Sequence, residues 1–114
     1  MTELVRLSDI RRTRRVFFNR TELNRLLSLY SRRVMSGEWR DYAIDHGHGY
    51  ATFSIFRHTA ERPTYSITKA VGKSRQGGTR WVLRAGPRKL KQGPSIDEVL
   101  TVLDRQPRLV WPSN

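Results

Sequence analysis

The sequence predicts an α+β fold of two layers, with an N-terminal helix, an antiparallel β-meander of four to five strands, a C-terminal helix and a short terminal strand or tail. Two observations lead to this prediction. Apolar residues recur at helical spacing before residue 37 and after residue 95, whereas between these positions the spacing drops toward two. Since helices and strands occupy separate stretches of the chain, we expect both helices to cover one face of a single sheet.

Length and composition indicate one domain without a membrane segment. A chain of 114 residues suits a single domain with its own core, and no apolar run approaches the roughly 18 residues that a membrane helix needs. We divide the chain into a basic arm at residues 1–16, which we expect to be partly disordered, and a single α+β domain at residues 17–114. Without cysteine and without an export signal, the chain is expected in the cytoplasm.

The first helix is expected from about Arg20 to Ser36. Asn19 suits the N-cap, and Glu22 stands three residues later, where its side chain can bond back to the cap. Arg25 and Arg32 are seven residues apart and are expected on the face opposite the buried stripe. That stripe should consist of the apolar residues Leu23, Leu26, Leu27, Tyr30 and Val34.

The strands alternate side chains between two faces. In the most strongly predicted strand, Ala51, Phe53 and Ile55 share one face, and the other face carries Tyr50 and Phe56. Because both faces are partly apolar, we expect this strand to be central in the sheet. In the third strand Ile67 and Val71 are expected to share a face. The expected strands are Tyr42–Asp45, Tyr50–Arg57, Thr64–Val71, Arg80–Ala85 and Lys89–Gln92.

The second helix is expected to begin after Ser95, which forms a capping box with Glu98. Pro107 stops it, and Arg108–Trp111 follows as a last strand or an apolar tail. Its buried stripe should contain Ile96, Val99, Leu100 and Leu103.

Charge is the most unusual property of the chain. The formal net charge is +12, from 22 basic and 10 acidic residues. The excess is concentrated, because residues 1–40 carry ten bases against four acids and residues 73–92 carry seven bases and no acid, while residues 41–72 are balanced. A surface that serves only solubility usually mixes both signs. The distribution therefore predicts a neutral scaffold flanked by two basic segments.

These basic segments favour a small nucleic-acid-binding or ribonucleoprotein-associated module that contacts phosphates, with RNA ahead of DNA because no helix-turn-helix is evident. Arginine dominates the basic residues, and its planar fork suits phosphate. The candidate contacts are Arg11, Arg12, Arg14, Arg15, Lys73, Arg75, Arg80, Arg84, Arg88, Lys89 and Lys91. The alternative is an interaction or regulatory adaptor whose basic surface meets an acidic protein, with Trp39, Trp111 or a sheet edge as the anchor.

We expect no catalytic activity, because the sequence shows no nucleophilic side chain next to a general base and no convincing set of metal ligands. His46 and His48 could form a metal pair, with Asp41 or Asp45 adding a carboxylate. An ordinary exposed turn is the favoured interpretation, since side chains in a glycine-rich turn need not converge. We therefore expect no enzyme, no cofactor and no metal.

Three aromatic residues allow two interpretations. Trp39, Tyr42 and Tyr50 could form an exposed surface on which bases stack. Alternatively, they could fill the core between sheet and helix, as aromatic residues usually do. The core interpretation is favoured.

Four short motifs resemble an uncharacterised family of small alphaproteobacterial proteins known only as a domain of unknown function. They are ELNRLLSLY at residues 22–30, GEWRDYAID at 37–45, FSIFR at 53–57 and AERPTYSI at 60–67. The resemblance covers about Phe17 to Leu103. It implies a bacterial cytoplasmic protein, and it carries no activity, cofactor or catalytic residue.

Overall fold

The computed structural model describes residues 15–58, 62–72 and 78–107 of the chain. Within these residues the expected α+β fold is confirmed, with a helix, five strands and a second helix in chain order. The predictions for residues 1–14 and for Arg108–Trp111 lie outside the described residues. The elements are α2 (Arg20–Met35), β1 (Asp41–His46), β2 (Tyr50–Phe56), β3 (Tyr65–Val71), β4 (Thr79–Ala85), β5 (Arg88–Gly93) and α3 (Ile96–Asp104).

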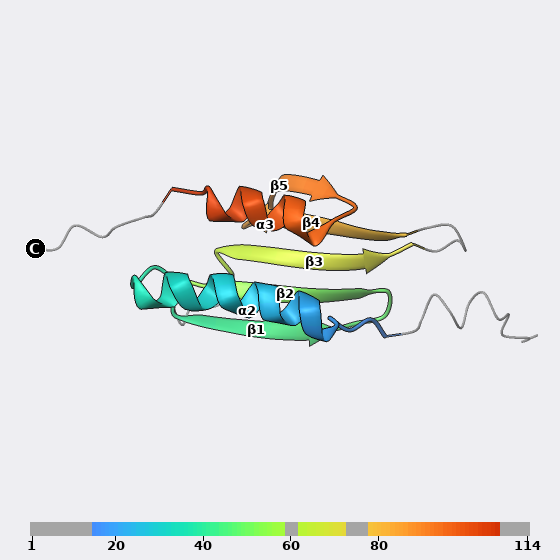
Figure 1. Cartoon of the computed structure of the whole chain (residues 1–114), viewed down its shortest axis with the longest axis horizontal. Helices are drawn as coiled ribbons and strands as arrows, with labels where there is room; N and C mark the ends of the chain where they lie inside the picture. The colour runs from blue at the N-terminus through green and yellow to red at the C-terminus, as the bar shows by residue number, and fades with distance from the viewer. Residues whose placement is uncertain (1–14, 59–61, 73–77, 108–114) are drawn as a thin grey trace, which may run out of the picture.

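The five strands form one sheet in the order β1-β2-β3-β4-β5, and every neighbouring pair is antiparallel. Both helices lie on the same face of this sheet and run side by side (Figure 1). Helix α2 lies over β1 and β2, and α3 packs against β4 and β5. The meander is thus a two-layer structure, and no described element covers its second face.

The beginning of α2 follows the predicted chemistry. Asn19 Oδ1 accepts a hydrogen bond from the Glu22 backbone N–H at 2.8 Å, and Glu22 Oε1 accepts one from the Asn19 N–H at 2.9 Å. This capping box satisfies two of the N–H groups that a helix start leaves unpaired. Gly37 follows the helix with φ +81°, a conformation that glycine adopts without the steric cost that other residues meet.

The buried face of α2 differs from the expected stripe. Leu29 is only 4% exposed, whereas Val34, which was expected in the stripe, is 37% exposed. Arg33 lies at the buried centre with 3% exposure. The expectation is confirmed for Leu26 and for the partly buried Leu23, Leu27 and Tyr30. It was wrong for Val34 and missed Leu29, because helical spacing fits either of two neighbouring faces and the positions of the sheet and α3 decide between them.

The beginning of α3 also differs in part. Ser95 Oγ accepts from the Asp97 N–H at 3.1 Å, so the cap is present. The reciprocal bond of the expected capping box does not form. The Glu98 carboxylate lies instead over Gly93 and 3.9 Å from Lys91 Nζ on β5, so an ion pair with the sheet replaces the local bond.

The core lies between the two layers. Val71, which was expected on the buried face with Ile67, is 43% exposed because β3 continues beyond the start of α2 (Figure 1). The side chains with at most 4% exposure that fill this layer are Leu26, Leu29, Trp39, Ala51, Phe53, Ile55, Ile67, Trp81, Leu83, Val99 and Leu103.

A buried arginine connects the two helices. Arg33 Nη1 donates to Glu38 Oε1 at 2.6 Å, and Arg33 Nη2 donates to the carbonyls of Asp104 at 2.7 Å and Leu103 at 3.4 Å. Its guanidinium carbon lies 5.3 Å from the ring centroid of Trp39. One side chain of α2 therefore neutralises a buried carboxylate and donates to the Asp104 carbonyl at the end of α3.

Replacing this arginine is expected to destabilise the fold severely. Arg33→Met leaves Glu38 as a buried charge without its partner, which typically costs about 3–5 kcal/mol of unfolding free energy. Arg32→Met is the matched control, because the Arg32 side chain is 67% exposed and lies 4.0 Å from its nearest carboxylate. Urea denaturation measures both. Equal losses in the two variants would contradict the role assigned to Arg33.

Tyr30 is the centre of an aromatic cluster under α2. Its ring lies edge-on to Tyr42 at 4.9 Å and to Phe53 at 6.2 Å, and stacks with Trp39 at 6.0 Å between centroids. Burial raises the pKa of the Tyr30 hydroxyl above 10.0, and the negative charges of Asp41 and ionised Tyr42 add to this effect. The cluster thus stabilises the neutral phenol.

This raised pKa predicts a loss of stability at alkaline pH. The unfolded chain ionises Tyr30 near its usual value of about 10, whereas the folded protein still holds the proton, so stability is complete below that pH and falls as pH rises toward the folded pKa. Tyr30→Phe removes this contribution. Its unfolding free energy is expected to fall less steeply above pH 10 than that of the wild type, whereas the exposed Tyr50→Phe control follows the wild type.

Candidate functional site

The face of the sheet opposite the helices presents a regular array of side chains, which we call the open face. The strand register places its residues in rows that cross the sheet. One row contains Ala43, Ser54, Ser66, Arg84 and Lys89, the next contains Asp45, Thr52, Thr68, Val82 and Gln92, and the third contains Tyr50, Ala70 and Arg80.

The centre of the open face consists of hydroxyl groups. Thr52 and Thr68 face each other across β2 and β3, and their Oγ1 atoms are hydrogen-bonded at 3.1 Å. Ser54 and Ser66 form the neighbouring pair, and all four residues are half-buried. Strand alternation in the sequence indicates these positions, yet the charge distribution alone gave no reason to single them out. The centre is therefore polar and uncharged.

The two edges of the open face carry opposite charges. Arg80 and Arg84 on β4 and Lys89 on β5 form the basic edge. Within the described residues, neither arginine side chain has an ion pair or a hydrogen bond, and Lys89 Nζ donates to the neutral Gln92 Oε1 at 2.7 Å. Asp41 and Asp45 lie on β1 at the opposite edge. The bases of this face are thus not neutralised by the acids of the same face.

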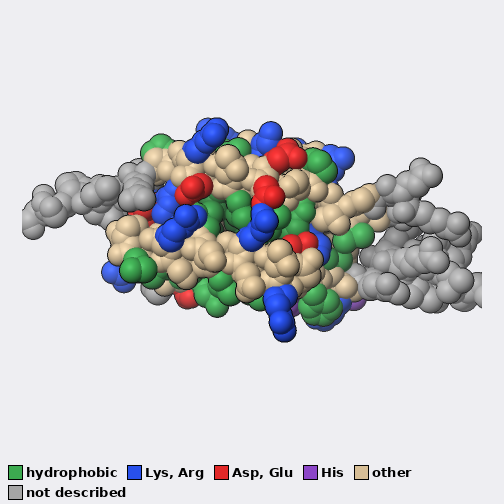
Figure 2. Space-filling view, in the orientation of Figure 1, with side chains coloured by type: hydrophobic (Ala, Val, Ile, Leu, Met, Phe, Trp, Pro, Cys, Tyr) green, Lys and Arg blue, Asp and Glu red, His purple; other side chains and the backbone are tan. Residues whose placement is uncertain are grey.

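On the helix side, by contrast, each described carboxylate lies within ion-pair distance of a base. Lys69 Nζ lies 2.8 Å from Glu22 Oε1, in addition to the Arg33–Glu38 and Lys91–Glu98 pairs. Figure 2 shows this side, where basic and acidic side chains alternate along the line between the helices. The helix layer pairs most of the described carboxylates, while Arg20, Arg88 and Arg105 on the same side form no ion pair within the described residues.

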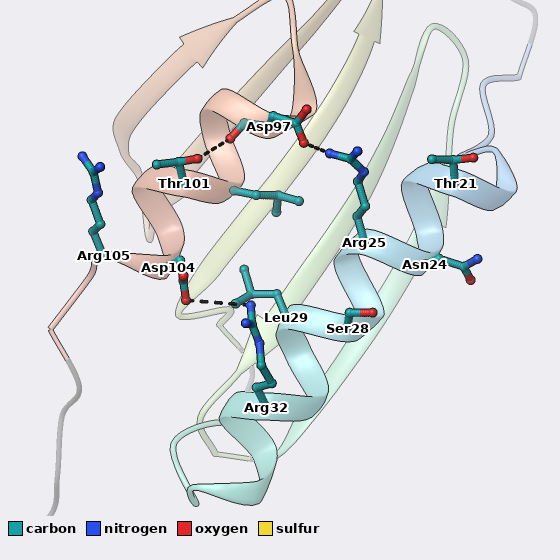
Figure 3. A pocket seen from close by; sticks show the side chains of 11 residues that line it. Thr21, Asn24, Arg25, Ser28, Leu29, Arg32, Asp97, Thr101, Asp104 and Arg105 are labelled. Atoms are coloured by element: carbon teal, nitrogen blue, oxygen red, sulfur yellow. Dashed lines mark hydrogen bonds and ion pairs between the residues drawn. The ribbon is translucent and has the colours of Figure 1, made fainter.

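A groove of about 650 Å³ runs between α2 and α3. Arg25 pairs with Asp97 across it, and Arg32 lies 4.0 Å from Asp104 (Figure 3). Both arginines are exposed, as expected, but the flank of α2 that carries them lies beside α3 and not opposite it. Since bases and acids oppose each other here, the groove offers little attraction to a polyanion.

The structure distributes the predicted basic contacts over both sides. Arg80, Arg84 and Lys89 lie on the open face, whereas Arg88 and Lys91 face the helix side, since their register partners are Ala85 and Leu83. A register shift between Leu83 and Arg84 separates Lys89 from Lys91, although simple alternation would place them together. Arg11, Arg12, Arg14, Lys73 and Arg75 lie outside the described residues.

The two basic segments are attached at the same end of the sheet. Arg15 forms an antiparallel bridge with His48 in the β1–β2 turn, and its Nη1 donates to the His46 carbonyl at 3.4 Å. Gly49 of the same turn accepts a hydrogen bond from the Val71 N–H at 3.0 Å, where β3 ends. Residues 1–14 and 73–77 therefore join the described fold close to each other, which the sequence did not indicate.

The three aromatic candidates do not form one surface. Trp39 is 2% exposed and belongs to the core, as favoured. Tyr42 is 39% exposed, but it stacks on Phe53 at 5.1 Å on the helix side. Tyr50 alone belongs to the open face, with 43% exposure and its ring against Gly47. A shared stacking platform of these three rings is therefore excluded.

The histidine pair is also separated. The His46 ring packs 4.5 Å from the Phe17 ring on the helix side, while His48 is exposed in the turn and bridged to Arg15. Among the residues that the structure describes, no group of three His, Cys, Asp or Glu side chains could hold a metal ion. In the same residues, no helix is long and apolar enough to cross a membrane.

The basic edge is expected to contribute nothing to folding. Replacing Arg80, Arg84 and Lys89 together by Gln should change the unfolding free energy by no more than about 0.5 kcal/mol, because no described ion pair is lost. Lys69→Gln is the contrasting variant. It loses bonds to Glu22 at 2.8 Å and to the Phe17 carbonyl at 2.9 Å, which costs about 1–3 kcal/mol.

Urea titration of both variants measures this difference. A triple variant less stable than Lys69→Gln would show that the basic edge has a structural role.

Comparison with known proteins yields one match. The family model described as protein of unknown function (DUF2794) matches residues 16–100 of the chain. No curated protein and no solved structure matches the chain significantly.

Proposed function

We propose that this chain, which belongs to the DUF2794 family of proteins of unknown function, is a small nucleic-acid-binding or ribonucleoprotein-associated module that contacts phosphates through the open face. The observation that supports this proposal most strongly is the basic edge formed by Arg80, Arg84 and Lys89, which lacks acidic partners among the described residues, whereas the described carboxylates of the helix side are paired with bases. No catalytic step belongs to the proposal.

The chemistry of the open face fits a sugar–phosphate backbone. Arginine forks bind phosphate oxygens in two places at once, and releasing the counterions of the nucleic acid supplies affinity. The hydroxyls of Thr52, Ser54, Ser66 and Thr68 lie in the rows that continue from the basic edge. They can donate to phosphate oxygens and exchange hydrogen bonds with ribose.

The architecture favours a single strand, and RNA over DNA. The described helices lie together on the far side of the sheet, so neither presents a recognition helix to a major groove (Figure 1). An open sheet edged by basic residues is a geometry that single-strand-binding domains use. The 2′-hydroxyl of ribose offers an additional donor and acceptor to the threonine and serine hydroxyls.

The basic segments outside the described residues belong to the same proposal. Arg11, Arg12, Arg14, Lys73 and Arg75 belong to segments that join the described chain at Arg15, Gly72 and Gly78. We include them in the proposal for their charge. Consistent with such a role, we place the protein in a bacterial cytoplasm.

A salt titration tests the proposal. Fluorescence anisotropy with labelled RNA and DNA strands of the same sequence should show binding that weakens steeply with salt, and RNA should bind more tightly. In Arg80→Gln/Arg84→Gln, two phosphate contacts are lost, so the slope of log K against log salt should decrease by about 1.4.

Arg88→Gln/Lys91→Gln is the matched control, because it removes the same charge from the opposite face of the same hairpin. It should retain the wild-type slope. Equal losses in both double variants would show attraction by net charge alone. Absence of binding at low salt would overturn the proposal, and recovery of one stoichiometric acidic protein after nuclease treatment would favour the adaptor alternative.

A further inference from the structure

The ring of Tyr50 is the feature of the open face that phosphate contacts alone leave unexplained. Tyr50 is the first residue of β2, and its side chain points to the open face with 43% exposure. Within the described residues it forms no ring pair with another aromatic side chain and no side-chain hydrogen bond. A large ring is therefore presented to solvent on the same face as the basic edge.

Gly47 determines how this ring lies. The Gly47 N–H donates to the Tyr50 carbonyl at 2.8 Å, so the two residues face each other across the β1–β2 turn. A Cβ at Gly47 would overlap Cε1 and Cζ of the Tyr50 ring and lie 2.6 Å from its hydroxyl oxygen. Gly47 does not have a positive φ, so its backbone does not require glycine. The ring therefore rests on the Gly47 backbone, and its position depends on the absence of a side chain there.

The strand register places Tyr50 in one row with Ala70 and Arg80. Neighbouring strands lie about 4.8 Å apart, so the backbones of Tyr50 on β2 and Arg80 on β4 are separated by about 10 Å. Ala70 on β3 presents only a methyl group between them. Arg80 is exposed and has no ion pair within the described residues. An aromatic ring and a guanidinium group thus stand on either side of a small residue.

The charges around this row give it a direction. Asp45 on β1 is exposed and is the register partner of Thr52 in the neighbouring row, so it lies on the side of Tyr50 that is away from Arg80. It has no ion pair within the described residues. A phosphate is therefore attracted toward β4 and repelled from β1. A ligand with one phosphate and one flat ring would place the phosphate at Arg80 and the ring at Tyr50.

We infer that this row binds one nucleotide of a single strand, with its base stacked on Tyr50 and its phosphate on Arg80. Stacking on an aromatic side chain tolerates any sequence, because every base has a π-face. The guanidinium group suits the phosphate oxygens. This inference rests on the proposed function and adds a base contact to it, so that the protein would recognise a strand of nucleotides and not a polyanion in general.

The first test compares two strands that carry the same phosphates. Fluorescence anisotropy measures the binding of a labelled single-stranded RNA and of an abasic strand of the same length. Tyr50→Leu should weaken binding of the RNA by about tenfold and leave the slope of log K against log salt unchanged, because no charge is removed. It should bind the abasic strand as the wild type does. Tyr50→Phe keeps the ring and is the matched control, with wild-type binding of both strands.

The second test moves the ring without removing it. Gly47→Ala displaces the Tyr50 ring, so it should weaken binding of the RNA. In the Tyr50→Leu background the same substitution meets no ring and should cause no further loss. Urea denaturation of all variants measures any structural role of the ring, which would change stability and leave binding of the RNA unaltered.

The outcomes separate this inference from the proposed function. If the wild type binds neither strand at low salt, the proposed function fails and the inference fails with it. If the wild type binds both strands and Tyr50→Leu binds the RNA equally well, the inference alone is overturned. It is also overturned if Tyr50→Leu loses affinity for both strands alike, or if Gly47→Ala weakens binding equally in both backgrounds.

Discussion

The contact between Arg33 and Glu38 determines how the helix layer is assembled. It joins α2, the segment before β1 and the last carbonyls of α3 through one guanidinium group that is almost completely buried. A buried ion pair often contributes little more to stability than well-packed apolar side chains would. Its hydrogen bonds, however, are satisfied only when the ends of both helices meet. The pair therefore selects the relative position of α2 and α3 on the sheet.

Because both helices lie on one face of the sheet, most of the described acidic side chains lie on that side and pair with bases there. The helix layer brings Glu22, Glu38 and Glu98 into contact with bases from other elements. Arg80 and Arg84 extend from β4 in the opposite direction, where the acids lie three strands away on β1. The acids are thus not spread evenly, and the bases of β4 on the open face keep no acidic partner among the described residues.

Features that depend on neighbouring residues could be predicted from the sequence. Features that depend on contact with an element distant in the sequence could not. The Asn19–Glu22 capping box was predictable because all its atoms belong to four consecutive residues. Glu98 has the same spacing from Ser95, yet its carboxylate pairs with Lys91 of β5. Alternation revealed the faces of β2, but the register shift at Leu83 and Arg84 moved Lys89 and Lys91 to opposite sides. Burial of Arg33 beside the exposed Arg32 had no local signal, since α3 creates the environment that accepts it.

The bases on the two faces of the sheet differ in what holds them. On the open face the strand register alone spaces Arg80 and Arg84, and their side chains have no described partner, so this surface can follow a flexible backbone of variable sequence. On the helix side, carboxylates of other elements hold Arg25, Arg33 and Lys69. These bases are therefore committed to joining elements of the fold, and those of the open face are not.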